Sequence, residues 1–192
     1  LDNMDALRLK EALRIIIKQV MTLLELLRGL ISRYAETPCM AFTHIQPAEP
    51  TTVGYRLSLY AQDLCRDLEE LHRASSHIRG KGMKGAVGSS ASYTELLRET
   101  EMSAEDLDRF VMNELGLKSF TAATQVYPRK QDWFVVNALS GTAASIYKMA
   151  FDLRILQSPP FGEWSSSLSL PPEYRALRPG HQFECHCPST AT

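Results

Sequence analysis

Apolar residues recur every three to four positions along three stretches of the chain, at about residues 5–34, 51–79 and 130–157. This period predicts three α-helices, each well beyond the usual three turns. In the first stretch the apolar positions spread over several faces of the helix: Leu7, Leu13, Ile15, Ile16, Ile17, Val20, Met21, Leu23, Leu24, Leu26, Leu27, Leu30 and Ile31. So wide an apolar face is typical of a helix that contacts partners on several sides, as in the middle of a bundle.

Capping residues and glycines predict where the helices begin and end. Thr51 or Thr52, after Pro50, is a suitable N-cap for the second long helix. A shorter helix is expected from Ser103, its N-cap, to Leu115, where Gly116 ends it. Nothing alternates with period two for long, so the predicted fold class is all-α.

Helices of this length would leave much apolar surface exposed in a monomer. We therefore expect a long-helix bundle core that is completed by oligomerisation. The alternative is an antiparallel three-helix bundle without a partner.

Proline divides the chain into two parts. Six of the ten prolines fall in the last 35 residues, together with a run of serines, and such a segment cannot continue a helix. We expect a helical domain over residues 1–157 and a Ser/Pro-rich tail over residues 158–192 that is loop or disordered.

Charge and composition exclude several classes of protein. Lys and Arg number 21 and Asp and Glu number 22, a net charge of −1, whereas nucleic-acid binders normally carry a basic excess. No apolar run reaches the roughly 18 residues of a membrane span, and charges interrupt the first segment where a signal peptide would lie. The four cysteines lack the spacing of a disulfide framework, which favours mostly buried thiols. We expect a soluble, cytoplasmic protein.

The first candidate for chemistry is His44, in the connection between the first two long helices. An imidazole can transfer a proton near neutral pH, and backbone N–H groups at a helix N-terminus favour an anionic ligand. The alternative is that His44 only hydrogen-bonds within its loop.

Several motifs share the order expected of one enzyme family. They are Thr43-His44-x-Gln46-x-Ala48 with Thr51-Thr52-x-Gly54, Gln62-Asp63-Leu64, Lys84-Gly85-Ala86-Val87-Gly88, Gln125-Val126-Tyr127-Pro128-Arg129-Lys130 and Asp152-Leu153-Arg154-Ile155-Leu156. In this arrangement residues 1 to about 157 resemble the central helical region of the adenylosuccinate lyase family, in the fumarase/aspartase superfamily.

The resemblance implies a homotetrameric lyase and assigns roles to three residues. His44 matches the family's general acid, and Thr43 and Gln125 match residues that contact the substrate, a succinylated purine nucleotide. For Gln125 a helix-capping role is the alternative. The implied reaction is a β-elimination that releases fumarate. It needs no metal or organic cofactor, because the substrate carboxylate itself delocalises the carbanion.

The chain also departs from the family. The mobile loop that carries the serine base is absent, and Gly88-Ser89-Ser90 is not a substitute because Ala91-Ser92-Tyr93-Thr94 follows it. We therefore expect the chain alone to be inactive. Another superfamily lyase, such as argininosuccinate lyase, or a non-catalytic helical assembly fragment is the alternative.

Other polar residues carry weaker predictions. Lys84 and Arg129 could attract an anionic substrate, but solvated or structural roles are favoured for both. His72 and His77 are expected at the surface. The sequence of His181, Cys185, His186 and Cys187 is too compact for one tetrahedral zinc ion, so no metal site is expected.

Overall fold

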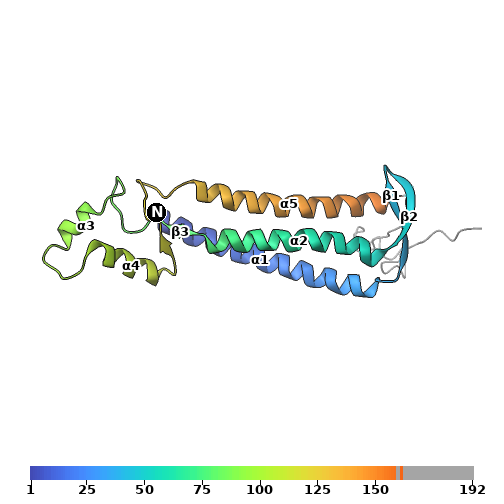
Figure 1. The fold of residues 1–192 in the computed structure, drawn as a ribbon, viewed down its shortest axis with the longest axis horizontal. Coiled ribbons are helices and arrows are strands. Elements are labelled where there is room, and N and C mark those ends of the chain that lie inside the picture. The colour runs from blue at the N-terminus through green and yellow to red at the C-terminus, as the bar shows by residue number, and fades with distance from the viewer. Residues whose placement is uncertain (159–160, 162–192) are drawn as a thin grey trace, which may run out of the picture. The chain divides into compact units, whose positions relative to one another are not determined.

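The computed structural model describes residues 1–158 and 161 (Figure 1). The elements, in chain order, are α1 (Asp2–Arg33), β1 (Pro38–Thr43), β2 (Gln46–Thr52), α2 (Val53–Ser76), β3 (Arg79–Gly80), α3 (Ala91–Leu96), α4 (Ala104–Glu114), β4 (Lys118–Ser119) and α5 (Lys130–Leu156). Helices dominate, which confirms the all-α class. The predicted character of the tail concerns residues that lie, apart from 158 and 161, outside the described part of the chain.

The three predicted long helices are α1, α2 and α5, and their caps explain their ends. The Tyr55 amide donates to Thr52 Oγ1 over 3.1 Å, so Thr52 caps the start of α2. Ser103 forms a capping box at α4: its Oγ accepts from the Asp106 amide over 3.1 Å, and Asp106 Oδ2 accepts from the Ser103 amide over 3.3 Å. The predicted boundaries are therefore confirmed to within a few residues.

The sequence pattern indicated no strands, whereas the structure has two short pairs of them. Strands β1 and β2 pair antiparallel, with Cys39 opposite Thr51 and Thr43 opposite Gln46, and the register shifts between Met40 and Phe42. Period-two alternation arises when a strand has one buried face, whereas the first five residues of β2 are all exposed. The hairpin therefore leaves no alternating pattern. The two-residue strands β3 and β4 pair in parallel.

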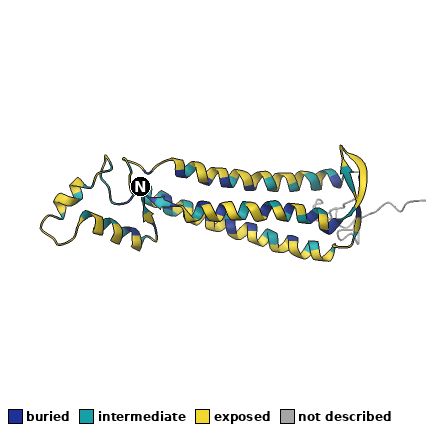
Figure 2. Ribbon diagram, viewed as in Figure 1, coloured by how far each residue is buried: buried dark blue, intermediate teal, exposed yellow. Residues whose placement is uncertain are grey.

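The helices contribute to two compact units, which we describe separately. Unit 1 contains residues 1–21 and 66–141, and unit 2 contains, among the described residues, 22–65, 142–158 and 161. The core of unit 1 consists of Ala6, Leu13, Ile17, Val20, Leu71, Ala74, Ile78, Met112, Leu117, Tyr127, Val135 and Ala138 (Figure 2). In unit 2 the buried apolar residues are Leu27, Cys39, Val53, Leu57, Tyr60, Leu64 and Leu156. Cys39 is thus buried as expected, but Cys65 is exposed.

Two side-chain amides bind the backbone of the segment that follows α2 in unit 1. Gln131 Oε1 accepts from the Arg79 amide over 2.8 Å, and its Nε2 donates to the Arg79 carbonyl over 3.1 Å. Asn3 makes the same pair of contacts with Gly82, at 3.0 and 3.4 Å. Two helical side chains therefore fix the backbone that follows α2.

Apolar side chains remain exposed on helices of both units. In unit 1 they include Ile15, Met21, Trp133, Phe134 and Val136, and in unit 2 Leu26, Ile146, Tyr147 and Phe151. Figure 2 shows exposed residues along the length of α1 and α5. A helix with apolar residues on all faces is usually covered by partners. The oligomer itself stays a prediction.

Candidate functional site

The β1–β2 hairpin turns through only two residues, His44 and Ile45. Their φ angles are 51° and 65°, and positive φ at both central positions is the geometry of a tight two-residue hairpin turn. Asn and Gly normally occupy such positions, because the left-handed conformation costs other residues about 1–2 kcal/mol each. A β-branched residue such as Ile45 is especially unsuited to it.

This turn places His44 away from the position expected from the sequence. The imidazole lies at the exposed tip of the hairpin, separated from the start of α2 by the whole of β2. The expectation that His44 lies near a helix N-terminus was therefore wrong, because β2 carries residues 46–52 away from the turn. Thr43, also exposed, is the last residue of β1 and pairs with Gln46 across the turn.

Backbone contacts fix the base of the hairpin in unit 2. The Val53 amide donates to the Thr37 carbonyl over 2.9 Å, and the Gly54 amide donates to the Tyr34 carbonyl over 2.8 Å. A Cβ added to Gly54 would lie 2.7 Å from Ala35 Cα, so only glycine permits this close approach of α2 to the end of α1. Arg56 Nη2 also donates to the Met40 carbonyl, which ties α2 to β1.

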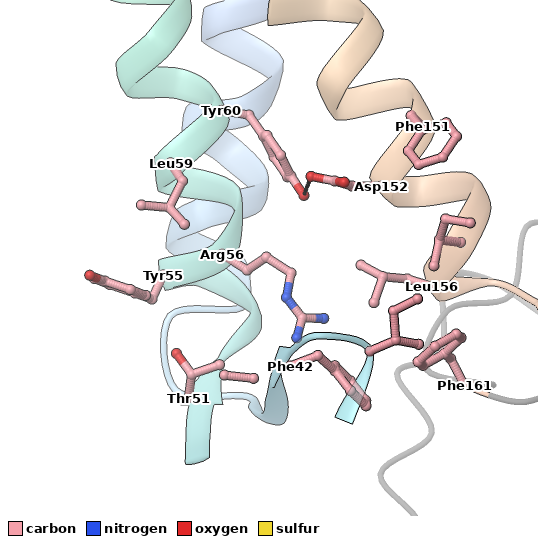
Figure 3. Close-up of a pocket in the computed structure, with 13 residues that line it drawn as sticks. Phe42, Thr51, Tyr55, Arg56, Leu59, Tyr60, Phe151, Asp152, Leu156 and Phe161 are labelled. Carbon is pink, nitrogen blue, oxygen red and sulfur yellow. Dashed lines mark hydrogen bonds between the residues drawn. The ribbon is translucent and has the colours of Figure 1, made fainter. Parts of the chain in front are cut away.

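A cavity of about 530 Å³ lies beside the hairpin, within unit 2 (Figure 3). Its wall is mainly apolar and consists of Ala41, Phe42, Ile45, Leu59, Phe151, Ile155, Leu156 and Phe161, with Thr51, Tyr55, Arg56, Tyr60 and Asp152 as the more polar lining. The rings of Phe42 and Phe161 meet edge to face, with centroids 5.1 Å apart. Ile45 is both a residue of the strained turn and part of the cavity lining, so the turn and the cavity are adjacent.

The charged groups of the cavity are partly neutralised by their neighbours. The Tyr60 hydroxyl donates to Asp152 Oδ2 over 3.0 Å, as Figure 3 shows. Burial, reinforced by this bond to a carboxylate, raises the pKa of Tyr60, so its hydroxyl remains a donor. Nearby, Lys148 Nζ donates to Asp63 Oδ2 over 2.8 Å, and this bond raises the pKa of Lys148. Arg56 supplies the cation that lines the cavity.

Arg56 and Tyr60 were not singled out from the sequence, and Asp152 was noted only as part of a family motif, without a role of its own. Arg56 and Tyr60 are four residues apart, which places them on one face of α2. Their spacing could have drawn attention to that face. Nothing near Asp152 in the sequence indicates its contact with Tyr60, which lies 92 residues earlier in the chain.

Gln125 lies in unit 1, in the loop before α5, and its side chain is exposed. Because α5 begins only at Lys130, Gln125 does not cap it, and that alternative was wrong. The loop is held by Tyr127, which is 2% exposed. Its amide donates to Asp2 Oδ2 over 2.7 Å and its hydroxyl to Asp132 Oδ1 over 2.6 Å. Thr43 and His44 therefore belong to unit 2 and Gln125 to unit 1.

Lys84 and Arg129 have structural roles, as favoured from the sequence. Lys84 Nζ donates to the Phe120 carbonyl over 2.8 Å and lies 4.0 Å from Asp108 Oδ2. Arg129 donates to Asp132 Oδ2 over 3.3 Å, and its guanidinium lies 4.6 Å from the centre of the Tyr127 ring. Both cations therefore hold loops of unit 1 in place.

The two histidines of the segment around the end of α2 lie at the surface. His72 is exposed on the C-terminal part of α2, and His77 is exposed one residue beyond the end of that helix; a surface position was predicted for both. Among residues 1–158 and 161, no three His, Cys, Asp or Glu side chains gather closely enough to hold a metal ion. The compact run from His181 to Cys187 lies outside the described residues. In the same described ranges, no helix is both long and apolar enough to cross a membrane.

Comparisons with known proteins place this architecture in a family. The sequence model of a lyase family matches residues 4–171, which extends beyond residue 157, where the quoted motifs end. The chain is 38% identical over 159 residues to adenylosuccinate lyase of Schistosoma mansoni, covering 82% of this chain and 33% of the relative. Against adenylosuccinate lyase of Saccharomyces cerevisiae the identity is 36% over 156 residues, covering 81% and 32%. The chain thus spans about a third of the length of these relatives.

Solved structures agree on the fold. A β-carboxy-cis,cis-muconate cycloisomerase from Acinetobacter calcoaceticus matches with a TM-score of 0.76 and 23% identity, over 92% of this chain and 39% of that protein. A fumarate lyase from Mesorhizobium matches with a TM-score of 0.74 and 24% identity, over 86% and 37%. The match to the family model over most of the sequence is the decisive finding: the chain belongs to the lyase family of the fumarase/aspartase superfamily.

Proposed function

We propose that the chain is the central helical part of an adenylosuccinate lyase, which cleaves adenylosuccinate to AMP and fumarate. The same enzyme would release fumarate from the succinyl-carboxamide ribotide of purine biosynthesis. The observation that carries the proposal is the 38% identity to an adenylosuccinate lyase, maintained over 159 residues.

The proposed reaction is a β-elimination. A base, which this chain does not supply, removes a proton from the carbon next to a substrate carboxylate. The electron pair forms the double bond of fumarate as the C–N bond breaks, and His44 donates a proton to the departing nitrogen. The exposed position of His44 and its strained turn support this role, because backbone strain concentrates at functional sites.

Thr43 and Gln125 are proposed to position the substrate. A hydroxyl next to His44 can orient the same substrate group, and an amide offers two donors and an acceptor without adding charge. The exposed apolar faces of α1 and α5 support a homotetramer. A cytoplasmic location is also part of the proposal.

A chimera tests the proposal. Residues 1–157 would replace the corresponding segment of the Schistosoma mansoni relative, and we expect the chimera to cleave adenylosuccinate. His44→Ala should lower kcat by about 10²–10⁴, the usual contribution of a positioned general acid. His44→Gln should do little better, since an amide cannot transfer the proton. Glu49→Gln, on the same exposed hairpin, is the matched control and should retain activity.

The binding role of Gln125 gives a different kinetic pattern. Gln125→Ala should raise KM as well as lower kcat, whereas the change at His44 should act mainly on kcat. Gln62→Ala, at another exposed glutamine, is the control. Near-normal kcat in His44→Ala would show that His44 only stabilises its loop. Turnover of argininosuccinate in place of adenylosuccinate would favour the other superfamily lyase.

The 192-residue chain alone should be inactive. It spans about a third of its relatives' length, and the motif of the base-bearing loop is absent from its sequence. This coverage is the observation that favours the second candidate, a helical assembly fragment without catalysis of its own. Turnover by the isolated chain would reject that candidate.

A further inference from the structure

A second cavity, of about 580 Å³, lies within unit 1 where α2 and α4 both end. We call it the basic cavity; its lining is Lys10, His72, Ser75, Ser76, His77, Ile78, Arg79, Asn113, Gly116, Leu117 and Lys118. Three lining residues carry a full positive charge, two more are histidines, and none is acidic. The cavity contains none of Thr43, His44 and Gln125.

Two of these cations are not neutralised by a neighbour. Within the described part of the chain, neither the Arg79 guanidinium nor the Lys118 ammonium forms a hydrogen bond or an ion pair with another side chain. Arg79 engages Gln131 only through its backbone. Lys10 Nζ donates to the Gly116 carbonyl over 2.8 Å, which uses one of its three N–H groups. The cavity therefore has unused donors and uncompensated positive charge.

The simplest alternative is that these cations only complement the two helix ends. A helix C-terminus carries about half a negative charge, so two ends offset about one of the three full positive charges. The carbonyl of Arg73 is already occupied: it accepts from the His77 amide over 3.2 Å, from Ser76 Oγ over 2.9 Å and from His77 Nδ1 over 2.7 Å. The helix ends therefore do not account for the charge of the cavity.

The bond from His77 also fixes its tautomer. Because a carbonyl oxygen can only accept, His77 Nδ1 must carry a proton, and Nε2 remains available to the ligand or solvent. Ser75, which forms no hydrogen bond through its side chain to the described residues, adds a hydroxyl donor to the lining. The lining thus combines a guanidinium, two ammonium groups and neutral donors.

We propose that the basic cavity binds a small phosphorylated molecule. A phosphate monoester carries about two negative charges and three acceptor oxygens. It can therefore use the several donors of the cavity more fully than a single carboxylate can. The fork of Arg79 matches two phosphate oxygens, and Lys118 acts as a point charge. The volume of about 580 Å³ lies in the usual range for small-molecule sites, so the ligand carries an organic body as well as the phosphate.

Calorimetry with inorganic pyrophosphate as the probe tests the charge-recognition step on the 192-residue chain. We expect saturable binding of one pyrophosphate per chain that weakens as salt is added. Arg79→Gln and Lys118→Gln should each raise Kd about tenfold, since each removes a charge-assisted hydrogen bond. Arg98→Gln is the matched control: it removes the same charge from an exposed residue paired with Glu95, and Kd should not change. If Arg79→Gln unfolds the chain, Lys118→Gln, at the exposed first residue of β4, still gives the answer.

The imidazole signals in an NMR titration locate the probe. Pyrophosphate should shift the ring resonances of His72 and His77 and leave that of His44 unchanged. A shift of His44 alone would place the anion at the hairpin and overturn the inference, without affecting the proposed lyase role. An unchanged Kd for pyrophosphate in both cavity variants would also overturn the inference. So would tighter binding of tricarballylate, a small molecule with three carboxylates, than of pyrophosphate, because the cavity would then prefer carboxylates to phosphates.

Discussion

Gly88 and Ala123 approach each other so closely that a Cβ added to Gly88 would lie 1.7 Å from the Ala123 carbonyl oxygen. Gly88 has a φ of 83°, which other residues rarely adopt. The contact joins the glycine-rich loop after α2 to the loop that carries Gln125. The position of Gln125 therefore depends on a glycine 37 residues earlier in the chain.

Gly88→Ala should destabilise unit 1. Positive φ and the clash with a backbone carbonyl together should lower the free energy of unfolding by about 2–4 kcal/mol. Gly29→Ala is the control, because an added Cβ meets nothing within 4 Å in α1 and should stabilise the helix by about 1 kcal/mol. Urea denaturation of both variants checks the opposite signs. Equal stability of Gly88→Ala and the wild type would show that the two loops can separate at no cost.

Ile45→Gly should raise the free energy of unfolding, by up to about 1 kcal/mol. The change relieves the left-handed strain of the turn, offset in part by the greater flexibility of glycine in the unfolded chain. The side chain is 69% exposed, so little burial is lost. Ile15→Gly, in the interior of α1 and 48% exposed, should instead lower stability by about 1 kcal/mol. A destabilised Ile45→Gly would mean that the turn is not strained.

Stability should fall with rising pH through the titration of Tyr127. Burial, together with the hydrogen bond to Asp132, raises its pKa from 10.0 to about 12. Between these values the unfolded chain has lost the phenolic proton while the folded chain retains it, so the free energy of unfolding declines from about pH 10 upwards. Urea denaturation at pH 8 to 11 should show a shallower decline for Tyr127→Phe than for the wild type.

Asp132→Asn provides a second measurement of the same coupling. It removes the negative charge that opposes ionisation and should lower the pKa of Tyr127, which ultraviolet absorbance of the tyrosinate can follow. An unchanged titration would show that the 2.6 Å contact does not control the hydroxyl.

Substitutions at two neighbouring leucines of α1 should have different effects, one on self-association and the other on folding. Leu26 is 63% exposed and Leu27 is 4% exposed. Leu26→Lys should weaken self-association in sedimentation measurements and preserve the helical circular dichroism. Leu27→Lys should unfold the chain, because burying an unpaired ammonium costs several kcal/mol. A wild-type chain that is monomeric at tens of micromolar would contradict the oligomer itself.

The helices were predictable because their stabilising features are local. Apolar residues recur at the helical period, and Thr52 and Ser103 bind amides only three residues away. The hairpin was not predictable in this way. Its β2 strand contains Pro47 and Pro50 and has no buried face, so neither composition nor alternation indicates a strand.

The candidate site was predictable only in part. His44 was selected from its motif, but its left-handed backbone has no signature, since His-Ile is not a typical sequence for such a turn. The cavity beside it depends on Asp152 reaching Tyr60, a contact between residues 92 positions apart. Contacts of that kind arise from packing between helices, which periodicity within one helix does not specify.

The paired hydrogen bonds of Gln131 make this one side chain act as a neighbouring strand for β3. Strand β4 pairs with β3, and the Gln131 amide occupies the backbone N–H and carbonyl that Arg79 would otherwise offer to another chain. Exposed strand edges recruit other molecules into intermolecular sheets. We therefore expect the glutamine to protect the chain against aggregation. Its loss, for example in Gln131→Leu, should appear first as turbidity that increases with protein concentration and accelerates when preformed aggregate is added.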